Sequence, residues 1–301
     1  MLRKTSPSRK AFLVVNTIVL GLITLLCFYP FWYILVYSLS DATKAQAGVT
    51  FWFKGFSLNN FVKVMELKGI GSAVFVSVAR TLLGTLLTVF ACTFMGYLFT
   101  KEELPARKFI YRALIVTMYV GGGLIPTYLT ISAYKLVNTF WVYVVPSLVS
   151  AYNVILVKTF VEQLPASLEE SAVLDGAGAF TVYRCIILPL SKPIVATIAT
   201  FTAVGHWNSY MDNYLYVSKT SLNTLQYLLY KFLNSTQELT KMLQQGDTSA
   251  IHQMEAASRE ILTPMGVRMT ITVITIIPIF LVYPFMQKYF SKGIMIGAVK
   301  G

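Results

Sequence analysis

The sequence predicts an all-α integral membrane protein with six transmembrane helices. Of its 301 residues, 55% are hydrophobic and only 13% are charged, and the mean hydropathy is +0.63. This composition excludes both an ordinary soluble domain and a disordered chain. The uncharged apolar segments each reach the roughly 20 residues that a helix needs to cross a bilayer.

The first segment predicts a transmembrane helix that begins on the cytoplasmic side. Residues 1–10, MLRKTSPSRK, are a basic N-terminus, and no charged residue follows over residues 11–40. A secretory signal peptide begins in a similar way, but its apolar region has only about 7–15 residues. We therefore expect residues 11–40 to be the first span, bent by Pro30 near its outer end.

The remaining segments complete one transmembrane domain over residues 11–301. Residues 41–71 and 217–265 are mixed in charge and are expected to be outer loops with short helical turns; within the second loop, residues 235–260 suggest two helices joined at Gly246. Glycines 121–123 and Pro126 are expected to break the third span. The six spans are expected at about 11–40, 72–100, 110–134, 136–160, 193–216 and 266–287.

Charge and cysteine content narrow the function classes. Six spans put both termini and residues 162–192 on one side, where lysine and arginine are modestly more frequent, as on a cytoplasmic face. The net charge of +12 does not indicate a nucleic-acid partner, because the basic residues are scattered among apolar spans instead of forming a stripe. Three cysteines, Cys27, Cys92 and Cys185, cannot form a paired framework and are interpreted as small hydrophobic residues.

Residues 162–192 predict two short amphipathic helices joined by a glycine turn. Pro165 ends the preceding helix. Ser167 lies three residues before Glu170, which is the spacing of a capping box. Gly176 is placed to end the first helix in the left-handed conformation. The second helix is expected over residues 180–187, where Phe180, Tyr183, Ile186 and Ile187 recur at spacings of three and four and Pro189 and Pro193 follow.

This loop carries a resemblance to a known family. The string E-S-A-V-L-D-G-A-G (170–178), followed by I-I-L-P-L-S-K-P (186–193), resembles the EAA loop of the membrane subunits of bacterial ABC importers, with Ser171 where alanine is usual. The C-terminus KYFSKGIMIGAVKG (288–301) is similar to that of carbohydrate permeases of the maltose-permease type, particularly the oligosaccharide branch of Gram-positive bacteria. FYPFWYILVYSLSD, GGGLIPTYL and WNSYMDNYLY are similar to that branch too.

The resemblance implies a type I ABC importer permease fold with both termini inside the cell. It implies a second permease subunit, two ATPase subunits, an extracellular substrate-binding protein or lipoprotein, and a carbohydrate substrate at the bacterial cytoplasmic membrane. ATP and Mg would be bound by the ATPases, and this chain would hold no cofactor. The implied coupling residues are Glu169, Glu170, Ser171, Ala172, Asp175, Gly176, Leu188 and Pro189, and the implied C-terminal contacts with the ATPases are Gly297, Lys300 and Gly301.

Two acidic residues of the loop keep alternative roles. Glu170 either caps its own helix or pairs with a basic residue of an ATPase, and both roles are compatible. Asp175 either contacts the ATPase or bonds the backbone at the turn before Gly176. Glu169 is interpreted mainly as a solvated neighbour of Glu170.

Polar and aromatic residues within the spans suggest a path for a polar substrate. Polar groups at membrane depth are costly unless they face the bundle interior or water, and aromatic rings with amide neighbours suit sugar rings. The alternative is an aromatic belt at the membrane interface. Arg80 and Arg112 are expected to snorkel or to pair within the bundle. The candidate path residues are Tyr119, Tyr152, Asn153, His206, Trp207 and Asn208.

The sequence lacks the motifs of a self-contained enzyme. It has no G-x-x-x-x-G-K-[ST] phosphate loop, no H-E-x-x-H or C-x-x-C metal motif, and only two histidines. The competing interpretation is a stand-alone channel or secondary carrier, but the EAA-like loop has no purpose in such a protein, and the inverted repeats common in carriers are not recognisable here.

Overall fold

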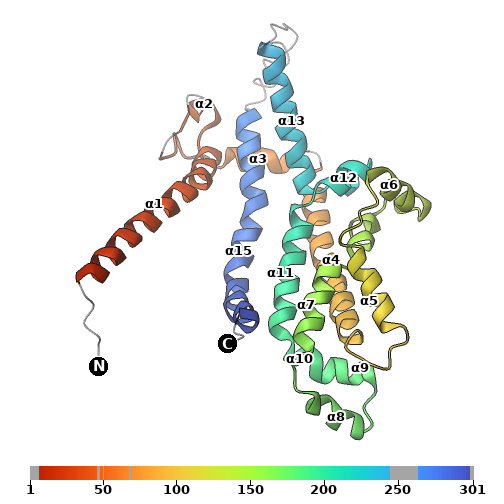
Figure 1. The fold of residues 1–301 in the computed structure, drawn as a ribbon. Helices are drawn as coiled ribbons and strands as arrows, with labels where there is room; N and C mark the ends of the chain where they lie inside the picture. Colours follow the sequence, from red (N-terminus) through yellow and green to blue (C-terminus); the bar gives the residue numbers. More distant parts are fainter. Residues whose placement is uncertain (1–6, 46–47, 50, 68, 245–263, 299–301) are drawn as a thin grey trace. The chain divides into compact units, whose positions relative to one another are not determined.

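A computed structural model describes residues 7–45, 48–49, 51–67, 69–244 and 264–298, with residues 7, 235–244, 264 and 285–298 described as backbone only. The regular secondary structure of this part of the chain is helical, apart from an isolated antiparallel bridge between Ser40 and Phe56. The helices are labelled in Figure 1. The all-α prediction is confirmed for the described residues.

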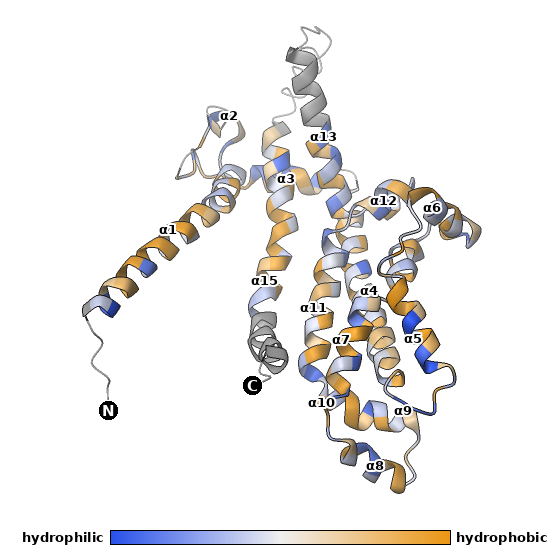
Figure 2. Cartoon of the chain, in the orientation of Figure 1, coloured by the Kyte–Doolittle hydropathy of each residue, from blue (hydrophilic) through white to orange (hydrophobic). Residues whose placement is uncertain are grey.

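Three helices are long and apolar enough to cross a membrane by themselves. They are α1 (Pro7–Ser38), α4 (Ile70–Leu98) and α15 (Pro264–Ala298), with candidate spans at Ser8–Ser38, Ile70–Leu98 and Met265–Pro284. Figure 2 shows α1 as largely apolar along its length. Pro30 lies inside α1, and Pro278 and Pro284 lie inside α15.

Two further spans are possible if bent helix pairs are each counted as one. The 3-10 turns Phe140–Tyr143 and Val145–Ser147 precede α7 (Ala151–Val161) at a bend of 46°. The segment Ala179–Leu190 precedes α11 (Lys192–Asn208) at a bend of 84°. The described residues thus contain up to five spans by length and composition.

Several predicted spans are interrupted where the sequence carries helix-breaking residues. The break predicted around glycines 121–123 is present, because α5 (Arg107–Val116) ends before it and α6 (Leu124–Ala133) begins after it. The span predicted over 136–160 is not one continuous helix. Pro146 lies within the 3-10 turns, and Ser150, in an extended conformation, caps α7 by accepting from the Asn153 N–H. The predicted span 193–216 is also broken, since Ser209 is extended and α12 (Met211–Tyr216) begins anew.

The described residues cluster into two units. One contains residues up to 67 together with 231–276, and the other contains 68–230 and the residues from 277 onward. In the first unit, α2 (Ala42–Ala45) and α3 (Asn59–Glu66) are the short helical turns predicted for the first outer loop. The end of α1 packs there against Ala45, Val49 and Phe53 and the start of α15, and the Trp32 indole donates to the Phe51 carbonyl at 2.9 Å.

The second unit is built around α4, which packs against α7 and α11. Glycines on α4 permit the close approach. A Cβ at Gly96 would lie 2.6 Å from the Val157 side chain, and one at Gly84 would lie 2.4 Å from Nε2 of His206. At one end of this unit, α8 (Ala166–Leu174), α9 (Ala179–Val182), a π-helical turn (Tyr183–Ile187) and α10 (Leu188–Leu190) follow α7 (Figure 1). After α12, the 3-10 turn Thr220–Leu222 leads into α13 (Leu225–Gln244).

Candidate functional site

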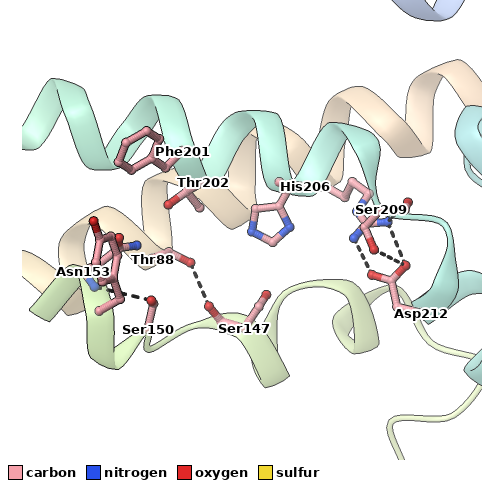
Figure 3. Close-up of a pocket in the computed structure, with 12 residues that line it drawn as sticks. Thr88, Ser147, Ser150, Asn153, Phe201, Thr202, His206, Ser209 and Asp212 are labelled. Atoms are coloured by element: carbon pink, nitrogen blue, oxygen red, sulfur yellow. Dashed lines mark hydrogen bonds and ion pairs between the residues drawn. The ribbon is translucent and has the colours of Figure 1, made fainter. Parts of the chain in front are cut away.

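A cavity of about 480 Å³ with both polar and apolar walls lies in the second unit between α4, α7 with its preceding turns, and α11 (Figure 3). Its walls carry hydroxyl, amide, imidazole and aromatic groups, and Arg80 and Asp212 contribute the charged groups. The lining residues are Arg80, Thr88, Ser147, Ser150, Tyr152, Asn153, Phe201, Thr202, Gly205, His206, Ser209 and Asp212.

One end of the cavity is held by a buried ion pair. Arg80 on α4 has a side chain only 2% exposed, and its two terminal nitrogens engage both carboxylate oxygens of Asp212. The guanidinium also donates to the Ser209 carbonyl at 3.1 Å and lies 4.6 Å from the centre of the Tyr143 ring. The prediction that Arg80 pairs within the bundle is confirmed. Arg80 contacts both Ser209, directly after α11, and Asp212 on α12, so it bridges the two sides of the break between these helices.

The middle of the cavity has hydrogen-bonding capacity left over. Thr88 on α4 donates to the Ser147 carbonyl at 3.3 Å, whereas the buried Thr202 hydroxyl on α11 has no hydrogen-bond partner. Figure 3 shows His206 between the Thr202 side of the cavity and the Asp212 side. Phe201 and Tyr152 add aromatic faces beside these groups.

The structure brings together three of the six predicted path residues. Tyr152, Asn153 and His206 line the cavity. Trp207 is buried outside it, and Asn208 is exposed, where its side-chain oxygen accepts from Gln226 at 3.1 Å. Tyr119 is 84% exposed and lies in the break between α5 and α6. The periodicity of α11 explains the division, because residues 201, 202, 205, 206 and 209 share one helix face whereas 207 and 208 point elsewhere.

The glycine turn of residues 162–192 has the predicted conformation. Gly176 has φ +86°, and the backbone bonds form a Schellman motif, with the Ala177 N–H bonding the Ala172 carbonyl at 2.9 Å and the Gly176 N–H bonding the Val173 carbonyl at 3.0 Å. No atom lies within 4 Å of a Cβ built at Gly176, so backbone conformation alone demands glycine.

Two details of this loop differ from the prediction. The prediction of a capping box is wrong. Pro165 is the N-cap and α8 begins at Ala166, so Ser167 lies inside the first turn instead of capping it. The second helix does not close at Pro189 but continues to Leu190. Since Pro189 has no N–H and crowds the carbonyl four residues before it, the preceding turn widens, and the Leu188 N–H bonds the Tyr183 carbonyl five residues back.

The second helix of the pair is anchored in the core of the unit. Val182, Tyr183 and Ile187 are buried against Tyr97 of α4, Val157 of α7 and Ile198 of α11. The Tyr183 hydroxyl lies 2.7 Å from the Thr93 hydroxyl, and this hydrogen bond is buried. Leu188 packs at the edge of this cluster and Pro189 is exposed.

The first helix of the pair, α8, has an inner and an outer side. On the inner side, Ala172 packs against the core and Glu169 pairs with Lys101, which follows α4. Burial lowers the pKa of Lys101, and the nearby Glu103 acts in the opposite direction. The outer side exposes apolar and acidic groups together, with Leu174 87%, Val173 56% and Leu168 43% exposed. Glu170, Ser171 and Asp175 are exposed as well.

Sequence reasoning missed the position of Glu169 and the role of the turn after α4. Glu169 is not a solvated neighbour of Glu170, since the Tyr97 hydroxyl donates to its carboxylate at 3.1 Å and Lys101 pairs with it. Glu169 lies three residues, about one turn of helix, before Ala172, which packs against the core. This spacing was the signal in the sequence that Glu169 faces inward. Of the predicted C-terminal contacts, Gly297 is described only as helical backbone, and Lys300 and Gly301 lie outside the described residues.

Within the described residues, no group of three or more histidine, cysteine, aspartate or glutamate side chains is arranged to hold a metal ion.

Comparisons with known proteins give relatives along almost the whole chain. Protein LplC of Bacillus subtilis (strain 168) is 35% identical over 293 residues, which are 97% of this chain and 96% of that protein. The polygalacturonan/rhamnogalacturonan transport system permease protein YtcP of the same organism is 32% identical over 278 residues, 92% of this chain and 94% of that protein. No model of a known protein family matches the chain.

A solved structure shares the fold. It is the crystal structure of a bacterial ABC transporter involved in the import of the acidic polysaccharide alginate. One of its chains matches with a TM-score of 0.83 and 24% identity over 96% of this chain and 99% of that chain.

Proposed function

The chain belongs to the ABC transporter permeases, and we propose that it is the membrane-spanning subunit of an importer that carries a carbohydrate, an oligosaccharide, into a bacterial cell. In this family the ATP is hydrolysed by partner subunits, so the chain is a transport subunit and not an enzyme. The names of YtcP and of the alginate transporter support a saccharide substrate.

The proposed assembly contains this chain, a second permease subunit, two ATPase subunits and an extracellular substrate-binding protein. The chain spans the cytoplasmic membrane six times with both termini inside, and ATP and Mg are bound by the ATPases. Long apolar helices support a multi-pass membrane protein. The exposed apolar residues along the first part of α1, such as Phe12, Leu22 and Leu26, support contact with lipid or a second permease.

The observation that carries the proposal is the outer side of α8. A loop helix that exposes Leu168, Val173 and Leu174 next to Glu170 and Asp175 has the mixture of apolar and charged groups expected of a protein interface. Gly176 fixes the angle between this helix and the anchored second helix. We assign the ATPase contact to this side, and we keep Gly297, Lys300 and Gly301 as further contacts with the ATPases.

The cavity is the proposed substrate path within this subunit. Its hydroxyl and amide groups can exchange hydrogen bonds with sugar hydroxyls, and Tyr152 and Phe201 can lie against the apolar face of a ring. Because α4 and α11 both line the cavity and both pack against the anchored second helix, a movement of the helix pair would change the cavity's shape.

Co-purification and reconstitution test this function. The tagged chain would be isolated in mild detergent with its co-expressed partners and placed in proteoliposomes with the binding protein. Uptake would then be measured with oligogalacturonides and with neutral arabino-oligosaccharides. We expect co-purified ATPase activity and ATP-dependent uptake of one of these classes. Uptake by the chain alone without ATP would instead establish a secondary carrier, and repeated isolation without any ATPase would contradict the proposal.

A further inference from the structure

The docking helix α8 has little packing of its own to hold it in place. None of its residues is buried, and its inward packing residue is the small Ala172. The Ser171 hydroxyl bonds within the helix, to the Ser167 carbonyl. A helix that receives force from a partner needs a stiffer link to the bundle than one alanine provides.

Three residues supply such a link, which we call the Glu169 clamp: Tyr97, Lys101 and Glu169. The Tyr97 hydroxyl donates to the Glu169 carboxylate at 3.1 Å, the Lys101 ammonium pairs with the same carboxylate, and that ammonium also lies 4.4 Å from the centre of the Tyr97 ring. Tyr97 is fully buried, and the side chains of Lys101 and Glu169 are only 17% and 26% exposed. Charge-assisted contacts with this degree of burial are stronger than solvent-exposed pairs.

The clamp joins α8 to the helix that carries the cavity. Tyr97 lies in the last turn of α4, and the same helix presents Thr88 and Arg80 to the cavity. At 1.5 Å per residue, Tyr97 and Arg80 are about 26 Å apart along one continuous helix. A displacement of α8 therefore acts on a rigid rod whose other end forms the cavity wall.

We propose that Glu169 is a positioning residue for transport, which transmits the movement of the docking helix to α4 through Lys101 and Tyr97. This rests on the proposed function and divides the two adjacent glutamates: Glu170 faces the partner, whereas Glu169 faces inward and couples the partner's movement to the cavity. Loss of the clamp leaves the docking side intact and weakens the mechanical link behind it.

The test measures cavity movement directly and needs no knowledge of the transported sugar. In the purified complex with its ATPases, Phe201→Cys serves as a reporter, because this side chain lines the cavity and is 47% exposed. Its rate of reaction with a charged, water-soluble maleimide is compared with and without ATP and vanadate. Mass spectrometry of the peptide separates this cysteine from Cys27, Cys92 and Cys185.

The variants separate a transmitting role from a merely structural one. We expect Glu169→Gln and Lys101→Met each to reduce the ATP-dependent change in labelling by about fivefold or more, while the ATPases still co-purify. Lys101→Arg, which preserves the charge and the contact with the ring, should retain the response. The exchange of charges in Lys101→Glu with Glu169→Lys should recover at least half of it.

The neighbouring Glu102 provides the matched control. It pairs with Arg107 at 3.6 Å in the same turn but its side chain is 90% exposed, so Glu102→Gln should leave the labelling response unchanged. A full response in Glu169→Gln, or no recovery in the exchanged pair, would overturn the clamp while leaving the proposed function standing. If the parent complex hydrolysed ATP without any change in labelling, coupling through this subunit and the clamp would both be wrong.

Discussion

At the scale of single residues, the ion pair of Arg80 and Asp212 in the second unit is a feature whose disruption should lower stability strongly. Removing one partner of a buried ion pair leaves an uncompensated charge and costs about 3–5 kcal/mol. Arg80 is almost fully enclosed, and Asp212 additionally accepts from the Ser209 hydroxyl at 3.1 Å and the Asn213 N–H at 2.9 Å. The pair therefore fixes where α11 stops and α12 starts.

We expect Asp212→Asn to lower the stability of the detergent-solubilised protein by about 3–5 kcal/mol, since Arg80 would keep its charge without a carboxylate. The double variant Arg80→Leu with Asp212→Leu should lose less stability than the sum of the losses in the single variants Arg80→Leu and Asp212→Leu, because it removes both charges together. Thermal unfolding monitored by fluorescence measures this. Additive losses in the double variant would show that the two side chains do not interact as described.

His206 and Gly84 give a second residue-scale prediction. Gly84→Ala should destabilise the packing of α4 on α11 by about 1–3 kcal/mol, because the new Cβ would lie 2.4 Å from Nε2 of His206. Gly71→Ala on the same helix is the control, as no atom lies within 4 Å of its Cβ. Adding His206→Ala should recover stability in the Gly84 variant, and an absence of recovery would refute the contact.

At the scale of elements, the helix pair depends on one backbone conformation. Gly176 has φ +86°, whereas Gly178 has φ −72°, and neither has an atom within 4 Å of a built Cβ. Alanine at the first position costs about 1–2 kcal/mol for the left-handed conformation, and at the second it is tolerated.

We therefore expect Gly176→Ala to reduce ATP hydrolysis stimulated by the substrate-loaded binding protein, and Gly176→Pro to abolish it. Proline cannot adopt this φ and would also remove the N–H that bonds the Val173 carbonyl. Gly178→Ala should retain stimulated hydrolysis. Equal stimulation in all three variants, at equal membrane insertion, would show that the angle between α8 and α9 is unimportant.

The sequence predicted the helix pair better than it predicted the spans. The Gly176 turn depends on backbone sterics that a sequence displays directly. The break before α7 lies next to Pro146, whose effect the apolar pattern of residues 136–160 concealed, and the break after Asn208 lies beside the ion pair at Asp212, which no local periodicity reveals. The capping box failed because Pro165 could start the helix one residue before Ser167 would have to cap it.

Only part of the candidate site was predicted from the sequence, because the rest of its lining depends on how the helices pack. Polar and aromatic residues at membrane depth identified His206, Tyr152 and Asn153 as path residues, and the structure brings these three to one cavity. Thr88, Ser147 and Thr202 were missed, since isolated hydroxyl residues in apolar helices commonly bond their own backbone. To predict that Glu169 points inward, one would have needed to know that Lys101, 68 residues earlier in the chain, lies beside it.

At the scale of the whole molecule, we propose that partner ATPases move the helix bundle of the second unit by acting on α8 at one of its ends. The cavity, α4, the Glu169 clamp and α8 form a continuous mechanical connection within the second unit. In the proposed mechanism, their order along α4 lets a movement of the outer side of α8 displace the cavity wall.

Site-specific cross-linking tests this claim most directly. Leu174→Cys, at a position that is 87% exposed on the outer side of α8, would be treated in membranes with a short thiol cross-linker after replacement of Cys185 by serine. Tyr214→Cys on α12, at a position 54% exposed, would serve as the control. The account predicts an ATPase adduct from Leu174→Cys whose yield changes with ATP, and none from Tyr214→Cys. An ATPase adduct from position 214 and not from 174 would contradict it.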